Sequence, residues 1–201
     1  MKGLQGYTIR LANEAEVAYL PDIERAAAMR FLPYLDQLDI TADLLEGLTP
    51  PRFLRWAQLE KRLWVAVSEL VGQSNPDALA KPVGFIVAKY LPGSCFIVEL
   101  DVHPEFGRLG IGSALIEACC KGAIARNRSQ VTLTTFRYIP WNIPFYQRLG
   151  FRVLPAAQWS SAIQAIVEHE TRYGFAPEHR GVMGRRLLRP VKLSKFAQGD
   201  R

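Results

Sequence analysis

The stretch that decides the fold reads Glu99-Leu-Asp-Val-His-Pro-Glu-Phe-Gly-Arg-Leu-Gly-Ile-Gly-Ser-Ala-Leu-Ile116. The apolar run Phe96–Val102 predicts a strand, and Leu109–Arg126 predicts a helix after a glycine-rich turn. Glycine lets a ligand approach the backbone closely, and the first turn of a helix presents unpaired N–H groups at the positive end of its dipole. The order strand, glycines, helix therefore indicates an anion site, to which Arg108 can add a charge.

Two familiar phosphate-binding patterns are excluded at this turn. The dinucleotide pattern G-x-G-x-x-G needs a third glycine where Leu115 stands, and the Walker A pattern needs a lysine after Gly112. From these residues alone two interpretations stay open. The turn binds an anion, or its glycines ease the packing of a helix start on the strand.

The rest of the chain predicts one α/β domain. Hairpins followed by strand–helix–strand units call for a mixed sheet with helices on its faces, and Gly72–Pro82 reads as a loop between two strands. The predicted strands are Thr8–Leu11, Leu63–Leu70, Val83–Tyr90, Val131–Phe136, Phe151–Leu154 and Val182–Leu188; the predicted helices are Glu14–Leu35 with an interruption at Pro21, Thr49–Glu60, Ile143–Leu149 and Ser160–Tyr173.

Composition fits a soluble globular protein. Of 201 residues, 49% are hydrophobic and 22% charged, which excludes a disordered chain. We find neither an apolar run of about 18 residues nor the start of a signal peptide, so we expect no membrane span. The three cysteines show no metal-ligand spacing, and we expect reduced thiols, a cytoplasmic location and no metal site.

The net charge of +6 comes entirely from the last 22 residues, which carry seven Lys or Arg against one Asp. The rest of the chain is neutral. We interpret residues 190–201 as a solvated basic tail that follows a domain of residues 1–189. A DNA-binding arm is the alternative, but no nucleic-acid motif accompanies the tail, and no nucleic-acid partner is expected.

Two acids lie in the strand that leads to the turn. Regular alternation would place Phe96, Val98, Leu100 and Val102 on one face, with Glu99 and Asp101 about 6–7 Å apart on the other. Buried carboxylates are costly in a central strand, and their proximity can raise a pKa towards that of a working base. Either they act as a base, or they face a solvated cleft that selects cationic substrates.

Two motifs resemble those of the GCN5-related N-acetyltransferase (GNAT) superfamily. Val102, Pro104, Gly110 and Gly112 match its acetyl-CoA-binding motif, although Gly107 stands where a Gln or Arg is usual. The block Pro140-Trp-Asn-Ile-Pro-Phe-Tyr-Gln-Arg-Leu-Gly-Phe151 is similar to its later motif, an Asn followed by Tyr-x-x-Leu-Gly-Phe. Asn142 is either the helix N-cap or a cofactor ligand; Gly150 can close the helix, with Phe151 packing back.

The resemblance implies a GNAT-like α/β fold: a mixed, mostly antiparallel sheet of about six to seven strands, flanked by helices and splayed at its central strands. It implies acetyl-CoA as co-substrate and direct attack by an amine, with Glu99 as general base, Asp101 as runner-up, and Tyr146 as general acid. The backbone N–H of Val102 would stabilise the oxyanion. The implied cofactor-binding residues are Leu100, Asp101, Val102, Gly107, Arg108, Leu109, Gly110, Ile111, Gly112, Ser113, Asn142 and Tyr146.

The acceptor is left open between a small-molecule amine and a peptide or protein amine, and a homodimer is an open alternative. In the family, acceptor recognition comes from the N-terminal helices and the C-terminal third. Several aromatic residues there could line a pocket or simply pack in the core: Phe31, Trp56, Trp64, Trp141 and Trp159. We interpret His103, His169 and His179 as surface or structural residues, with His179 placed to approach the acceptor. A non-catalytic acyl-CoA-binding sensor is the alternative function.

Overall fold

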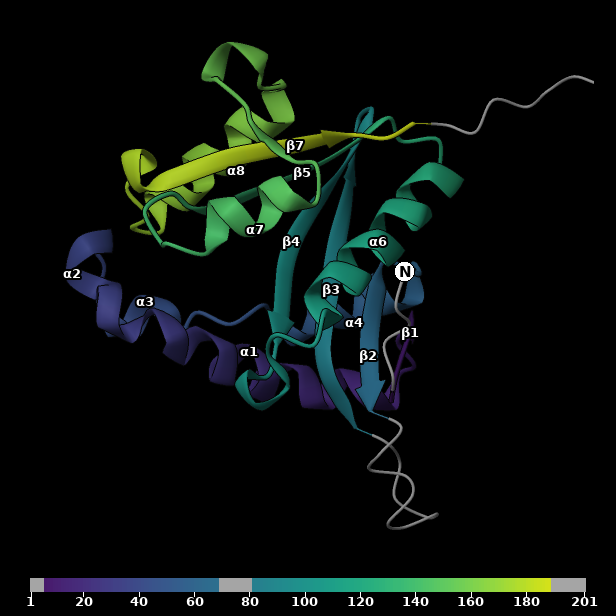
Figure 1. Ribbon diagram of the computed structural model, residues 1–201. Helices are drawn as coiled ribbons and strands as arrows, with labels where there is room; N and C mark the ends of the chain where they lie inside the picture. Colours follow the sequence, from purple (N-terminus) through teal and green to yellow (C-terminus); the bar gives the residue numbers. More distant parts are fainter. Residues whose placement is uncertain (1–5, 69–80, 189–201) are drawn as a thin grey trace, which may run out of the picture.

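The computed structural model describes residues 6–68 and 81–188, and its centre is a seven-stranded sheet (Figure 1). The strand order is β1-β2-β3-β4-β5-β7-β6, and only the β4–β5 pair is parallel. This confirms the expected mixed, mostly antiparallel sheet. The strands are β1 Tyr7–Leu11, β2 Leu63–Ser68, β3 Pro82–Leu91, β4 Ser94–Val102, β5 Gln130–Phe136, β6 Arg152–Val153 and β7 Arg180–Arg186.

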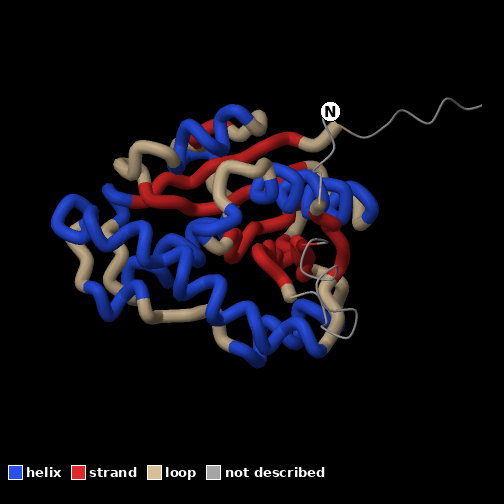
Figure 2. Tube along the Cα trace, turned by 60° about the horizontal axis from the view of Figure 1, so that its bottom comes forward, coloured by secondary structure: helices blue, strands red, loops and turns tan. Residues whose placement is uncertain are grey.

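Helices cover both faces of the sheet (Figures 1 and 2). One face carries α6 (Ile111–Ala125) and α7 (Asn142–Arg148), and the other carries α1 (Leu20–Ala28), α4 (Pro51–Leu59) and α8 (Ser161–Arg172). The short elements are η1 Ala15–Tyr19, η2 Met29–Tyr34, α2 Leu35–Leu38, α3 Ala42–Leu45, η3 Pro104–Phe106, η4 Ala156–Gln158 and η5 Pro177–His179. Within the described ranges, no helix is long and apolar enough to cross a bilayer.

The segment predicted as one helix, Glu14–Leu35, forms η1, α1 and η2 in succession. Pro21 does not interrupt a helix but stands in the first turn of α1, where its missing N–H costs no hydrogen bond. The chain instead changes between 3₁₀ and α geometry, with Pro33 inside η2. Most of the predicted loop Gly72–Pro82, and the basic tail 190–201, lie outside the described residues.

The core consists of layers on each side of the sheet. The largest cluster fills the space between the sheet and α6, where Trp64 packs so closely that a Cβ on Gly122 would meet its ring. A second cluster lies under α1 and α4, and a third under α8. Both faces of the sheet are therefore covered by a core layer.

The sheet splits along β4. Its first residues, Ser94–Phe96, pair with Gln130–Thr132 of β5, and no pairing with β5 follows. From there β4 and β5 diverge in Figure 1, although β4 stays paired with β3 up to Val102. The split leaves the second half of the central strand without a neighbour on one side.

A β-bulge lies at the start of this split. Val87 pairs with Glu99 whereas Ala88 pairs with Ile97, so Val98 is an extra residue in β4. The predicted alternation is therefore wrong: Phe96 and Val98 face the α1 and α8 side, but Leu100 packs with the α6 cluster. The expected shared face of Glu99 and Asp101 does survive, because both follow the bulge.

Candidate active site

The glycine-rich turn ends in the free N-terminus of α6. Arg108 and Gly110 both have left-handed backbone, with φ of 63° and 83°. The first helical hydrogen bond runs from the N–H of Ala114 to the carbonyl of Gly110, at 3.0 Å. The N–H groups of residues 111–113 precede it and have no partner within the helix, so they are free to donate to an anion.

Gly107 does not serve this site as expected. Its N–H donates to the carbonyl of Pro104 at 3.0 Å, so this donor is already used within η3. A Cβ at Gly107 would lie 3.0 Å from the same oxygen, which explains why a glycine replaces the larger residue of the family motif. The backbone N–H groups that are available to an anion therefore come after Gly107.

The second half of β4 presents open backbone to the split. Residues 94–97 are buried, whereas residues 98–102 are all partly exposed. The N–H of His103 donates to Val83 of β3 at 2.9 Å, and in an antiparallel ladder every second residue faces the same neighbour. Leu100 and Val102 therefore direct their N–H and C=O groups away from β3, towards the split beside α6, where the N–H of Leu100 donates to Oε1 of Glu99 at 3.3 Å.

Three carboxylates meet at this place. One oxygen each of Glu24, Glu99 and Asp101 lies within 4.8 Å of the other two. Burial and then the charge of Glu24 raise the pKa of Glu99 to about 7, against weaker opposing effects from the N–H of Leu100 and from Arg180. Burial and then Glu99 raise the pKa of Asp101 well above its ordinary value. At neutral pH the Glu99 carboxyl can both lose and accept a proton.

Glu24 is the functional candidate that sequence reasoning missed. It comes from α1, its side chain is buried, and its Oε1 accepts hydrogen bonds from the N–H and hydroxyl of Thr49 at 2.8 and 2.9 Å. The signal was present in the sequence, because Glu24 stands in the apolar stripe of the helix with Leu20, Ile23 and Ala27. A carboxylate in such a stripe needs a partner or a function.

Tyr146 lies on α7, close to the same acids. Burial and then the charges of Glu99 and Asp101 raise its pKa far above the ordinary value, so the phenol keeps its proton. Its position is fixed by the end of α7, where the N–H of Phe151 donates to the carbonyl of Tyr146 at 3.1 Å and the two rings meet edge to face. With Gly150 at φ 83°, this is the Schellman closure that the motif predicts.

Asn142 is not the helix N-cap. Trp141 occupies the N-cap position, and no side chain caps α7; Asn142 is the first helical residue. The capping interpretation is therefore wrong, because the helix starts one residue earlier than a cap at Asn142 requires. Contact with a cofactor remains the open role for this partly exposed side chain.

An aromatic cluster lies beside α7 and connects it to the N-terminal segment. Phe31 and Tyr34 of η2 contact the ring of Trp141, and Phe31 also contacts Phe136 of β5. The other predicted aromatics are structural: Trp64 packs in the core, Trp159 packs under α8, and Trp56 stacks on the guanidinium of Arg62. Of the expected pocket-lining set, Phe31 and Trp141 alone join this cluster.

The histidines do not approach the carboxylates as a group. His103 lies 3.8 Å from Glu105, and His169 packs on Tyr173. The Nδ1 of His179 lies 2.6 Å from the carbonyl of Leu38, so it joins the C-terminal third to the end of α2. This is a structural role on the expected acceptor side.

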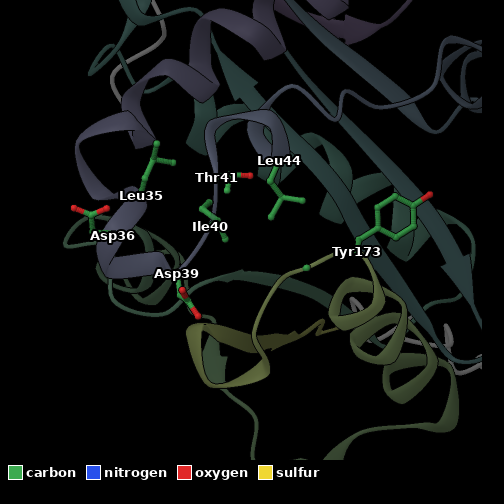
Figure 3. A pocket seen from close by; sticks show the side chains of 8 residues that line it. Leu35, Asp36, Asp39, Ile40, Thr41, Leu44 and Tyr173 are labelled. Atoms are coloured by element: carbon green, nitrogen blue, oxygen red, sulfur yellow. The ribbon is translucent and has the colours of Figure 1, made fainter.

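A cavity of about 420 Å³ opens on that side (Figure 3). It lies between the α2–α3 segment and the end of α8, and Asp36, Asp39, Leu44 and Tyr173 contribute to its lining. None of the three clustered carboxylates lines it. The cavity is thus a separate feature from the split in the sheet.

The sequence matches a known family over the part of the chain that builds this site. Residues 60–153 match the acetyltransferase (GNAT) domain. This segment belongs to the GNAT superfamily. The match covers β2 to β6, and so includes the split, the glycine-rich turn and Tyr146, whereas Glu24 lies outside it.

Solved structures of GNAT proteins share the fold. The PaiA N-acetyltransferase of Thermoplasma acidophilum, in complex with coenzyme A, is 14% identical with a TM-score of 0.65, over 90% of this chain and 99% of that one. The N-acetylglutamate synthase of Neisseria gonorrhoeae, complexed with coenzyme A and N-acetyl-glutamate, is 14% identical with a TM-score of 0.63, over 91% of this chain and 35% of that one. The ribosomal-protein-S18-alanine N-acetyltransferase of Escherichia coli is 14% identical with a TM-score of 0.57, over 94% and 99%.

Proposed function

We propose that this protein transfers an acetyl group from acetyl-CoA to an amine by direct attack on the thioester. The observation that carries the proposal is the partly exposed end of β4, whose backbone beyond β5 lies beside the N-terminus of α6. An extended arm that contains amide groups can pair with the backbone of β4, while a pyrophosphate can bind at the N-terminus of α6. The related structures solved with coenzyme A support the same choice of ligand.

The residues present fit acetyl-CoA. The N–H groups of residues 111–113 and the side chain of Arg108 would hold the pyrophosphate, and the backbone of Leu100 and Val102 would pair with the pantetheine arm. The thioester carbonyl then lies near the N–H of Val102, which faces the split and can donate to the oxyanion. Asp101 would contribute through its side chain, because its backbone faces β3.

The chemistry starts from a protonated amine, whose ordinary pKa is near 10.4. Glu99 takes one proton, and the freed lone pair attacks the thioester carbon to form a C–N bond. When the C–S bond breaks, the electron pair leaves with sulfur, and the second nitrogen proton passes to it. The products are the amide, free CoA thiol and the proton held by Glu99, which returns to solvent.

Tyr146 stabilises the leaving sulfur. Because its pKa is raised by burial and by the acids, the phenol donates a hydrogen bond to the thiolate rather than giving up its proton. Once Glu99 has been protonated, one of the negative charges that raise this pKa is gone. Proton uptake by the base therefore makes Tyr146 a better donor at the moment when charge develops on sulfur.

An amine-library screen with acetyl-CoA tests the function, with release of free thiol as the readout. We expect thiol release that depends on the amine, with an amide product of matching mass. The Glu99→Gln variant and reactions without amine are the controls. Binding of acetyl-CoA without turnover on any amine would instead identify a non-catalytic acyl-CoA-binding domain.

A further inference from the structure

The three carboxyl groups at the split lack a cationic partner within residues 6–68 and 81–188. Among the residues that the structure describes, no Lys or Arg forms an ion pair with Glu24, Glu99 or Asp101. Arg25 pairs with Asp22, and the guanidinium of Arg180 is held by Glu170 at 3.0 Å. Carboxylates brought this close without a cation repel one another. The arrangement is therefore suited to binding a cation that arrives from outside.

Glu24 supplies one oxygen to this cluster and has one oxygen without a hydrogen-bond partner among the described residues. Its Oε1 is fixed by Thr49, whereas its Oε2 is buried with no hydrogen-bond partner in the described part of the chain. The residue is only 7% exposed, and Asp101 Oδ2 is likewise buried and unpartnered. Two elements far apart in sequence, α1 and β4, thus each supply an acceptor that lacks a donor.

The spacing of the oxygens fits one small donor. Because no two of them are more than 4.8 Å apart, a single atom can lie within about 2.8 Å of all three. That is the usual distance between a charged nitrogen and a carboxylate oxygen. A primary ammonium has three N–H donors for three acceptors, whereas a secondary ammonium has two.

We propose that Glu24, Glu99 and Asp101 together bind the ammonium group of the acceptor, which is a primary aliphatic amine that enters as a cation. The inference rests on the proposed acetyl transfer, since Glu99 is both a ligand of this ammonium and the base that takes its proton. Glu24 is then a specificity residue: it selects a charged primary amine over a secondary amine or a neutral aromatic amine.

The Glu24→Gln variant tests this role. The amide oxygen of glutamine can still accept from Thr49, so α1 keeps its position while one charge is lost. We expect the KM for cyclohexylamine to rise about 10- to 100-fold, with the KM for acetyl-CoA unchanged. Asp22→Asn is the matched control, because it removes a charge from the same helix at a side chain that is 81% exposed, and it should leave both constants unchanged.

A substrate series separates this inference from the proposed function. With wild type we expect cyclohexylamine to be preferred over N-methylcyclohexylamine and aniline, and the preference to shrink in Glu24→Gln. If wild type acetylates amines but Glu24→Gln leaves the KM for cyclohexylamine unchanged, the ammonium site is refuted and the acetyl transfer stands. If wild type acetylates no amine, the proposed function fails.

A binding measurement tests the ammonium site without turnover. Cyclohexylammonium chloride should raise the melting temperature of wild type but not of Glu24→Gln, and tetramethylammonium chloride, which has no N–H, should raise neither. Equal stabilisation by both salts would refute recognition of the N–H groups. Stabilisation by calcium or magnesium chloride alone, together with loss of turnover in EDTA, would overturn the inference in favour of a metal site.

Discussion

The two halves of β4 differ although they belong to one strand. Residues 94–97 are buried, and Ser94–Phe96 pair on both sides, with β3 and β5. Residues 98–102 are partly exposed, and Glu99–Val102 pair with β3 alone. The first half is apolar and serves the core; the second carries Glu99 and Asp101 and open backbone groups. One extra residue, Val98, lies where the structural half, residues 94–97, gives way to the chemical half, residues 98–102.

The largest expected effect comes from the base in the chemical half. Glu99→Gln should lower kcat about 100-fold or more, because the amine keeps its proton. Wild-type activity should rise as the pH passes upward through about 7, since the carboxylate acts only after it has lost its proton. The variant should lack this limb in a pH–rate profile. Glu168→Gln, on the exposed side of α8, is the charge control, and an intact limb in Glu99→Gln would assign the base elsewhere.

A smaller effect is expected from Tyr146, which faces the same half of β4 from α7. Tyr146→Phe removes the hydrogen bond to the leaving sulfur and should lower kcat about 10- to 100-fold, with little change in the KM for acetyl-CoA. Tyr90→Phe is the matched control, because Tyr90 packs against the same core cluster but is not among the groups that affect the pKa of Glu99 or Asp101. Equal activity of Tyr146→Phe and wild type would remove this residue from the mechanism.

The smallest expected effect comes from a comparison of two glycines of α6, Gly112 and Gly122. A Cβ on Gly112 would lie 3.4 Å from the ring of Phe145, an ordinary contact, and 3.9 Å from the side chain of Val102. Gly112→Ala should keep or slightly raise stability, because alanine favours a helix, yet raise the KM for acetyl-CoA about tenfold. In Gly122→Ala the Cβ would overlap the ring of Trp64, so the melting temperature should fall.

These paired variants place the anion site at the start of α6 and the packing requirement further along it. Thermal melts and the KM for acetyl-CoA measure the two effects separately. If Gly112→Ala bound acetyl-CoA as wild type does, the backbone of this first turn would not hold the pyrophosphate.

Local patterns in the sequence were enough to predict the elements and much of the site. The glycines, the strand acids and Tyr146 are local signals, and the fold and family they indicated are confirmed. Residue roles stay predictions. The bulge at Val98 could not be predicted, because Phe96, Ile97 and Val98 are all apolar and nothing in their order shows which one is extra.

Glu24 shows a second feature that could not be predicted from local sequence patterns. Its place in the apolar stripe of α1 marks it as unusual, but the stripe does not reveal that β4, some 75 positions later, supplies its neighbours. Likewise the motif suggested a free N–H at Gly107, which the tight turn of η3 uses for itself. Contacts between distant segments and competing local hydrogen bonds both need the folded chain.

The short parallel ladder also has a mechanical consequence. Antiparallel pairing joins β1 to β4 as one half of the sheet and β5 to β7 as the other, while only the three residue pairs Ser94–Phe96 with Gln130–Thr132 connect the halves. The two halves of the sheet are therefore joined less firmly to each other than the strands within each half. All three carboxylates lie on one side of this joint, because Glu99 and Asp101 belong to β4 and α1 packs against β3 and β4. Tyr146 lies on the other side, since α7 packs against β5, so the joint separates the acids from the phenol that faces them.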